Sequence, residues 1–363
     1  MHFGKTVLRS TVKAAWLSFA LCAAGFAQQN PAPAPQSPPS APPPTAWDPD
    51  YGPPRTAVPS TVEEPPSQPS APGQESPITS DKSADESGRF VFKKQVQEVV
   101  LHATVVDEAG HMVTGLDKSA FSIFVNNAPE PITSFRKEDV PVALGIVIDN
   151  SGSMRDKREK VSQAVLNLVR ASNPQDEVFV VNFNETPYLD QDYTSDVNLL
   201  QTAMHQVSSR GSTALYDAVV ASASHLRDNQ RLAKKALLVI TDGQDNMSQE
   251  TLQSAIRKLQ PDKGATIYAI GLSNGGMTRA GRDALQELAS STGGVAYFPR
   301  DLDEVDSITR AVAHDIRSQY TLAFKPGTMK AGYQAIRVEA RGLGKTRLIV
   351  RTRSGYYPGE TVR

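Results

Sequence analysis

The stretch VALGIVIDNSGSM, residues 142–154, decides the fold of this chain. Its first eight residues form a nearly continuous apolar run, which is typical of a strand covered on both faces of a parallel sheet. The run ends in Asp149, and Ser151 and Ser153 follow in a tight turn. Open α/β sheets bind ligands beyond the carboxyl ends of their strands, so this turn is the first candidate for a site.

Three further segments repeat the apolar strand pattern, at 177–183, 235–242 and 265–272. Apolar residues at helical spacing fill the intervals and follow the last of these strands. The predicted helical stripes are Val161, Val165, Leu168 and Val169; Leu199, Leu200, Met204 and Val207; Leu215, Val219, Val220 and Leu226; Leu252, Ile256 and Leu259; Leu285, Leu288 and Ala289; and Val305, Ile308, Val312 and Ile316. This alternation predicts an α/β fold over residues 141–319, with a doubly wound, mostly parallel sheet and helices on both faces.

Strand-like sequence flanks the α/β region on both sides, at 90–140 and 320–357. The first flank contains a predicted hairpin, FSIFVNNAPEPITSF, with an Asn-Asn-Ala-Pro turn. In the second flank, IRVEA and RLIVRT predict a hairpin around a Gly-Leu-Gly-Lys turn. Isolated hairpins are marginal in water, so we expect both flanks to form one small β-sandwich from which the α/β region emerges as an insertion.

The N-terminal 27 residues have the pattern of a secretory signal peptide. Lys5, Arg9 and Lys13 precede a short apolar segment at 14–26, and small residues follow at the expected cleavage site. An uncleaved anchor is the alternative, but 13 residues fall short of the roughly 20 that span a bilayer. We therefore predict a signal peptide at 1–27 and an exported protein, located in the periplasm, at the cell surface or outside the cell.

The single cysteine, Cys22, lies inside the predicted signal peptide. Leu21 stands before it, where a lipoprotein site would have a small residue, so lipidation is disfavoured. The mature chain would then contain neither a disulfide nor a thiolate ligand. Residues 28–88 hold 17 of the 26 prolines and few apolar groups, which predicts a disordered, Pro-rich linker. A Pro-x-x-Pro recognition ligand is the alternative, although partners of that kind are mostly intracellular.

Composition and motif content narrow the classes of function. Lys and Arg number 38 against 39 Asp and Glu, so the chain lacks the positive field that nucleic-acid binding usually needs. No His-Glu-x-x-His motif occurs. Gly344-Lys345-Thr346 resembles the end of a phosphate-binding loop, but Glu339 stands where that loop needs glycine, so we expect a hairpin turn. The chain is predicted to be neither an enzyme nor a nucleic-acid-binding protein, and to need no small-molecule cofactor.

Oxygen donors gather at the ends of the predicted strands. Asp149, Ser151 and Ser153 follow the first strand, Asp242 ends the 235–242 strand, and Thr213 opens a helix between the two. Mg²⁺ prefers hard oxygen ligands, so short hydroxyl and carboxylate side chains on fixed turns suit it. Each of these motifs alone is an ordinary turn or helix cap, and their common strand context is what favours a metal site.

The three pieces DNSGSM, GSTALYD and ITDGQDN resemble, in order and strand context, the metal-ion-dependent adhesion site of the von Willebrand factor A domain. The resemblance implies that Ser151 and Ser153 bind the ion directly and that Thr213 binds it directly or through water. It also implies that Asp149 and Asp242 hold waters around the ion. The implied ion is Mg²⁺, with Mn²⁺ or Ca²⁺ as alternatives, and it would capture an Asp or Glu carboxylate of a protein partner.

Further acidic and amide residues lie near the candidate site. Asn184, Asp217 and Asp245 are candidates for a partner-binding rim, although each is also explained as an ordinary loop or helix-start residue. The acidic segment 190–196 hints at calcium, but it lacks the glycine and the spaced glutamate of an EF-hand loop. We expect 190–196 to be a solvated loop.

The favoured function is an exported, non-enzymatic protein-binding or adhesion module. A rival is a subunit or assembly factor that docks an AAA+ ATPase or chelatase-like complex, and a third possibility is a structural envelope domain with a vestigial metal site. The flanking sequence, with V-T-G-L-x-K-x-x-F and a final R-S-G-Y-Y-P, is similar to a VWFA-related family common in acidobacteria. A closed-to-open switch would move the last predicted helix, 301–318, which leads directly into Tyr320.

Overall fold

A computed structural model describes residues 98–359 apart from 138, 206–207, 230, 262–263, 273–276, 328–330 and 343–346. Four predictions lie outside these described residues: the signal peptide, the Pro-rich linker, the helical-stripe position Val207, and the turn around Gly344-Lys345-Thr346. None of the helices in the described part of the chain is both long enough and apolar enough to cross a bilayer.

The central sheet has six strands within the described residues, in the order β10-β9-β8-β5-β6-β7. Neighbouring strands run parallel except β7, which is antiparallel to β6. The strands are β5 (Val142–Asp149), β6 (Glu177–Phe183), β7 (Pro187–Thr194), β8 (Lys234–Thr241), β9 (Thr266–Gly271) and β10 (Ala296–Tyr297). All residues of the central strands β5, β8 and β9 are buried, which explains their nearly unbroken apolar sequences.

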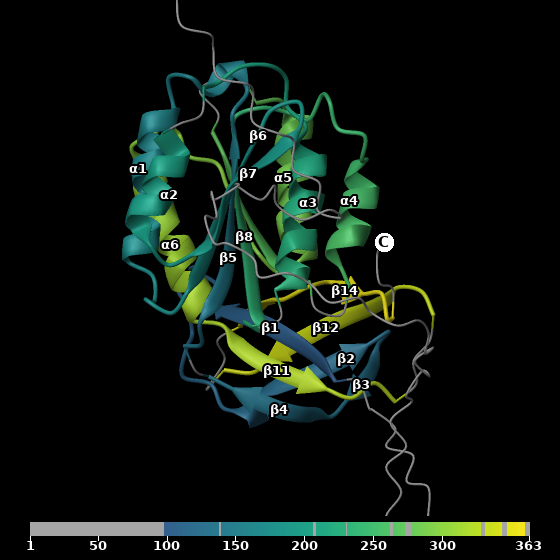
Figure 1. Ribbon diagram of the computed structural model, residues 1–363. Coiled ribbons are helices and arrows are strands. Elements are labelled where there is room, and N and C mark those ends of the chain that lie inside the picture. Colours follow the sequence, from purple (N-terminus) through teal and green to yellow (C-terminus); the bar gives the residue numbers. More distant parts are fainter. Residues whose placement is uncertain are drawn as a thin grey trace, which may run out of the picture. The chain divides into compact units, whose positions relative to one another are not determined.

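Helices cover both faces of this sheet (Figure 1). On one face, α1 (Arg158–Arg170), α2 (Val197–His205) and α6 (Glu304–Arg317) pack in one apolar cluster. On the other, α3 (Leu215–Asp228), α4 (Leu252–Leu259) and α5 (Arg279–Ser291) pack in a second. The doubly wound α/β prediction is therefore confirmed. One stripe position is wrong, because Leu199 is 48% exposed while its neighbour Leu200 is buried.

The strand β7 corrects the expectation of a solvated loop at 190–196, since its range reaches Thr194. Its residues pair antiparallel with β6, at the edge of the sheet. The Asp190 carboxylate accepts hydrogen bonds from the backbone and the side chain of Asn182, at 3.2 and 2.7 Å. Burial raises the pKa of Asp190 to about 6, against the effect of these bonds and of the Arg158 charge. A polar edge strand lacks the apolar run by which the inner strands were found.

The two flanks together form two antiparallel sheets, each of four strands in the described residues. Their orders are β13-β1-β11-β4 and β14-β12-β2-β3. The strands are β1 (Val99–Val106), β2 (Phe121–Val125), β3 (Ala128–Glu130), β4 (Ile132–Arg136), β11 (Tyr320–Phe324), β12 (Gln334–Ala340), β13 (Ile349–Arg351) and β14 (Gly355–Tyr356). Inward residues of both sheets share one apolar cluster, as in a β-sandwich. Each sheet mixes strands from both flanks.

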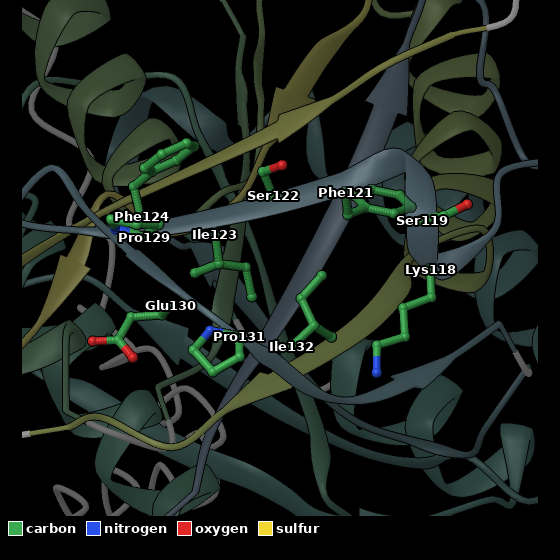
Figure 2. A pocket seen from close by; sticks show the side chains of 10 residues that line it. All are labelled: Lys118, Ser119, Phe121, Ser122, Ile123, Phe124, Pro129, Glu130, Pro131 and Ile132. Atoms are coloured by element: carbon green, nitrogen blue, oxygen red, sulfur yellow. The ribbon is translucent and has the colours of Figure 1, made fainter.

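The first predicted hairpin forms, but its turn consists of Asn126 and Asn127 alone, because Ala128 and Pro129 already belong to β3, and its return strand is incomplete. Asn126 and Asn127 have φ values of 48° and 66°, the left-handed conformation that a two-residue type I′ turn requires. After β3 the chain passes Pro131 and continues as β4, which belongs to the other sheet. An open groove of about 580 Å³ lies beside this corner. Figure 2 shows the side chains that line it, which come mainly from β2 and from the corner itself.

The second predicted hairpin is wrong. Residues of β12 pair with β2 and β14, whereas β13 pairs with β1 in the other sheet. Alternation along both segments correctly indicated strands, but β12 pairs with β2 and β13 with β1, both in the distant N-terminal flank.

Buried polar contacts join the sandwich to the α/β region. Asp315, on α6, accepts hydrogen bonds from Thr104 Oγ1 of β1 at 2.5 Å and from Arg351 Nη2 of β13 at 2.8 Å. Its side chain is 1% exposed. Arg353 donates to the carbonyls of Pro261 and Val100, at 2.8 and 2.6 Å. The last helix of the α/β region, α6, is thus hydrogen-bonded to strands from both flanks.

Candidate metal centre

The turn after β5 fixes Asp149 by two hydrogen bonds. Its Oδ1 accepts from the backbone N–H of Ser151 at 2.8 Å, and its Oδ2 accepts from Thr241 Oγ1 at 2.6 Å. The side chain is fully buried. Burial raises the pKa of Asp149, and the bonds from Thr241 and Ser151 oppose that shift. The carboxylate therefore joins the end of β5 to the end of the neighbouring strand β8.

The second carboxylate, Asp242, lies directly beyond β8. Its Oδ1 accepts a hydrogen bond from Ser153 Oγ at 2.7 Å, and Ser153 Oγ lies 3.2 Å from Ser151 Oγ. Its Oδ2 forms an ion pair with Lys157 Nζ. Two hydroxyls and two carboxylates are thus brought together from the ends of adjacent strands, as the sequence predicted.

The third hydroxyl, that of Thr213, lies against the same strand ends. A β-carbon placed on Gly243 would lie 3.3 Å from Thr213 Oγ1 and 3.8 Å from Asp149 Oδ2. The loop after β8 binds Thr213 directly, because Asn246 Oδ1 accepts from its N–H and Asn246 N–H donates to its carbonyl, at 2.9 and 3.0 Å. Gly152 N–H also donates to the carbonyl of Gly211 at 3.3 Å. All five predicted positions therefore gather at one edge of the sheet.

The profile of the von Willebrand factor type A domain family matches residues 144–311. Residues 144–311 form a von Willebrand factor type A domain. This stretch contains β5 from Leu144 onward, α1 to α5, the first part of α6 as far as Ala311, and the five candidate metal positions. Domains of this family often bind a divalent metal.

Several solved structures resemble the chain. Proximal thread matrix protein 1 from the mussel byssus is 19% identical with a TM-score of 0.45; the match covers 53% of this chain and 51% of that one. A von Willebrand factor type A protein from Catenulispora acidiphila is 15% identical over 74% of this chain and 76% of its own, with a TM-score of 0.44. The PilB minor pilin from Streptococcus sanguinis is 14% identical over 52% and 63%, with a TM-score of 0.41. A search of curated proteins returned no match.

The donor set of the A domain fits a hard divalent cation. It consists of hydroxyl and carboxylate oxygens, which Mg²⁺ prefers. Each carboxylate oxygen has a second lone pair beyond the hydrogen bond that it already accepts. Among the described residues, no cluster of three or more His, Cys, Asp and Glu side chains could hold a metal. A site here must therefore depend on Ser151, Ser153 and Thr213 as well as on the two carboxylates.

The three predicted rim residues all accept hydrogen bonds, and those of Asp217 and Asp245 link α3 to the segment between β8 and α4. Asn184 Oδ1 accepts from the N–H of Glu185 at 2.6 Å. Asp217 accepts from the backbone N–H groups of Gln249 and Glu250, just before α4, and Asp245 accepts from the N–H of Tyr216 and from the hydroxyl of Ser248. These bonds brace the loops beside Thr213. Contact of Asn184, Asp217 or Asp245 with a partner stays a prediction.

Sequence reasoning missed two cations at the site. Lys157 forms the ion pair with Asp242, and Arg158 donates to Asn150 Oδ1 and to the carbonyl of Met204, the latter at 2.6 Å. Asn150 in turn donates to the carbonyl of Ser208 at 2.9 Å. Lys157 follows the 3-10 turn at Gly152–Met154 and directly precedes α1, so no regular helical spacing relates it to Ser153.

Proposed function

We propose that this protein is an exported, non-enzymatic binding module whose A domain uses a divalent cation, most suitably Mg²⁺, to hold a carboxylate of a protein partner. The observation that carries the proposal is the convergence of Ser151, Ser153 and Thr213 with Asp149 and Asp242 at one sheet edge. Export rests on the N-terminal sequence pattern alone.

The chemistry of the donor set supports capture of an anion. Neutral hydroxyls from Ser151, Ser153 and Thr213 would hold the ion, and the carboxylates of Asp149 and Asp242 would offset part of its charge. When bound, the ion supplies a positive charge at the surface, which attracts a carboxylate. Ser153 is exposed, so a partner side chain can reach this edge of the site.

The first test is thermal unfolding in EDTA and in millimolar Mn²⁺ or Mg²⁺. A ligand that binds only the folded state stabilises it by about 2.7 kcal/mol at a hundredfold excess over Kd. We expect the metal to raise the Tm of the wild type and to leave the Tm of Thr213→Ala unchanged. Thr202→Ala is the matched control, because it removes a hydroxyl that bonds within α2, to the Asn198 carbonyl at 2.9 Å.

The second test addresses the partner. A short peptide with one Glu is compared with the same peptide carrying Gln, each with Mn²⁺ and with EDTA. We expect the Glu peptide to bind in Mn²⁺ and not in EDTA, and the Gln peptide to bind in neither. Absence of any metal-induced shift in the first test would refute the metal site and favour a structural role for the domain.

A further inference from the structure

We infer that Lys157 is a tethered cation that competes with the divalent metal for Asp242, and so sets the metal affinity of the A domain. This inference rests on the proposed metal site. It concerns a residue that belongs to none of the three motifs from which the site was predicted.

The first support is that both carboxylate oxygens of Asp242 already have a partner within the chain. Ser153 Oγ donates to Oδ1 at 2.7 Å, and the Lys157 ammonium pairs with Oδ2. The Asp242 side chain is 1% exposed and that of Lys157 is 15% exposed, so water screens this pair poorly. Lys157 Nζ also donates to the carbonyl of Ser153 at 3.2 Å.

The second support is that the backbone holds Lys157 in place. It precedes α1, its N–H donates to the carbonyl of Met154 at 2.9 Å, and its carbonyl accepts from the N–H of Val161 at 3.1 Å. Only the flexible side chain needs to be ordered for the ammonium to reach Asp242. An intramolecular partner of this kind acts at a high effective concentration.

The consequence follows from charge. A divalent ion that uses Asp242 meets a positive ammonium at the same carboxylate, so binding requires the side chain to swing away or the ion to accept a neighbouring like charge. The four-carbon side chain of Lys157 is flexible and partly exposed, so it can swing away from Asp242. Lys157 therefore weakens metal binding and at the same time neutralises Asp242 when no metal is bound to it.

The experiment measures Mn²⁺ affinity by isothermal titration calorimetry at fixed pH and ionic strength. We expect Lys157→Met to bind Mn²⁺ about tenfold more tightly than the wild type, a change that corresponds to about 1.4 kcal/mol. Lys157→Arg, which keeps the charge, should behave like the wild type. Lys160→Met is the matched control, because Lys160 pairs with the exposed Asp303 outside the site.

A second readout is urea unfolding in EDTA, where Lys157→Met should be less stable than Lys160→Met because Asp242 loses its counter-charge. Lys157→Gln replaces the Met variant if that one does not fold. Equal Mn²⁺ affinity of wild type and Lys157→Met would overturn the inference and leave the metal site intact. Binding by Lys157→Met alone would support the inference and refute metal use by the wild type. Absence of Mn²⁺ binding in the wild type and in Lys157→Met would refute the proposed metal site and, with it, the role of Lys157.

Discussion

Replacing Asp315 with Ala should destabilise the folded chain strongly. The carboxylate is 1% exposed and accepts hydrogen bonds from Thr104 at 2.5 Å and from Arg351 at 2.8 Å. Burial raises its pKa, and the Arg351 charge and the Thr104 hydroxyl oppose that shift. Removing one partner of a buried pair leaves the other charge uncompensated, which costs about 3–5 kcal/mol. Arg351 is 25% exposed, so water can solvate part of its charge after Asp315 is removed. We therefore expect a loss near the lower end of that range, about 3 kcal/mol.

The assay is urea unfolding followed by far-ultraviolet circular dichroism. Thr104→Val removes one hydrogen bond to a charged acceptor and should cost about 1.5 kcal/mol. Asp303→Ala is the control: Asp303 is 82% exposed and pairs with Lys160 at the surface, so its loss should lie within about 0.5 kcal/mol. If Asp315→Ala unfolds at the same urea concentration as Asp303→Ala, the buried pair does not hold α6 to the sandwich.

Three further outcomes are expected. Gly145→Ala should lower the stability by about 1–3 kcal/mol, measured by urea unfolding, because a methyl there would collide with Phe179 and Leu237; a wild-type midpoint would contradict this packing. Asn127 has φ 66°, so Asn127→Ala should cost about 1 kcal/mol while Asn127→Gly stays near wild type, and equal losses would contradict the turn. The pKa of Asp190 is raised from 3.8 to about 6, so its stabilising contribution is fully present below pH ~4 and is lost as pH rises through about 6. Asp190→Asn should remove that slope, at most about 3 kcal/mol, from the pH dependence of unfolding.

Burial explains which strands the sequence predicted. The strands expected at 142–149 and 177–183 match β5 and β6, the one expected at 235–242 lies one residue after β8, and the one expected at 265–272 extends one residue beyond β9 at each end. These strands are covered on both faces, and their apolar runs show it. The edge strand β7 is polar and was not predicted. The segments of β12 and β13 were wrongly predicted to pair with each other, because their true partners lie far away in the sequence. Local alternation indicates that a segment is a strand, but does not identify the strand beside it.

Part of the candidate site could likewise be predicted from the sequence, and part could not. Strand ends meet at one sheet edge by topology, so Asp149, Ser153 and Asp242 could be brought together from sequence order alone. The ion pair of Lys157 with Asp242 depends on which way a flexible side chain turns, and no strand or helix pattern records that. Metal binding by these residues and contact of the rim with a partner stay predictions.

The pairing of both flanks in one sandwich has a consequence during synthesis on the ribosome. Ala103 of β1 pairs with Tyr320 of β11, and Val105 pairs with Val350 of β13. At about 5–20 residues per second, β1 waits roughly 10–40 s for its first partner to be made. The A domain can complete its own sheet in that interval, whereas the early apolar strands have open edges. A chain that stops before β11 would therefore carry a folded domain with unpaired strands attached, and those strands would favour aggregation.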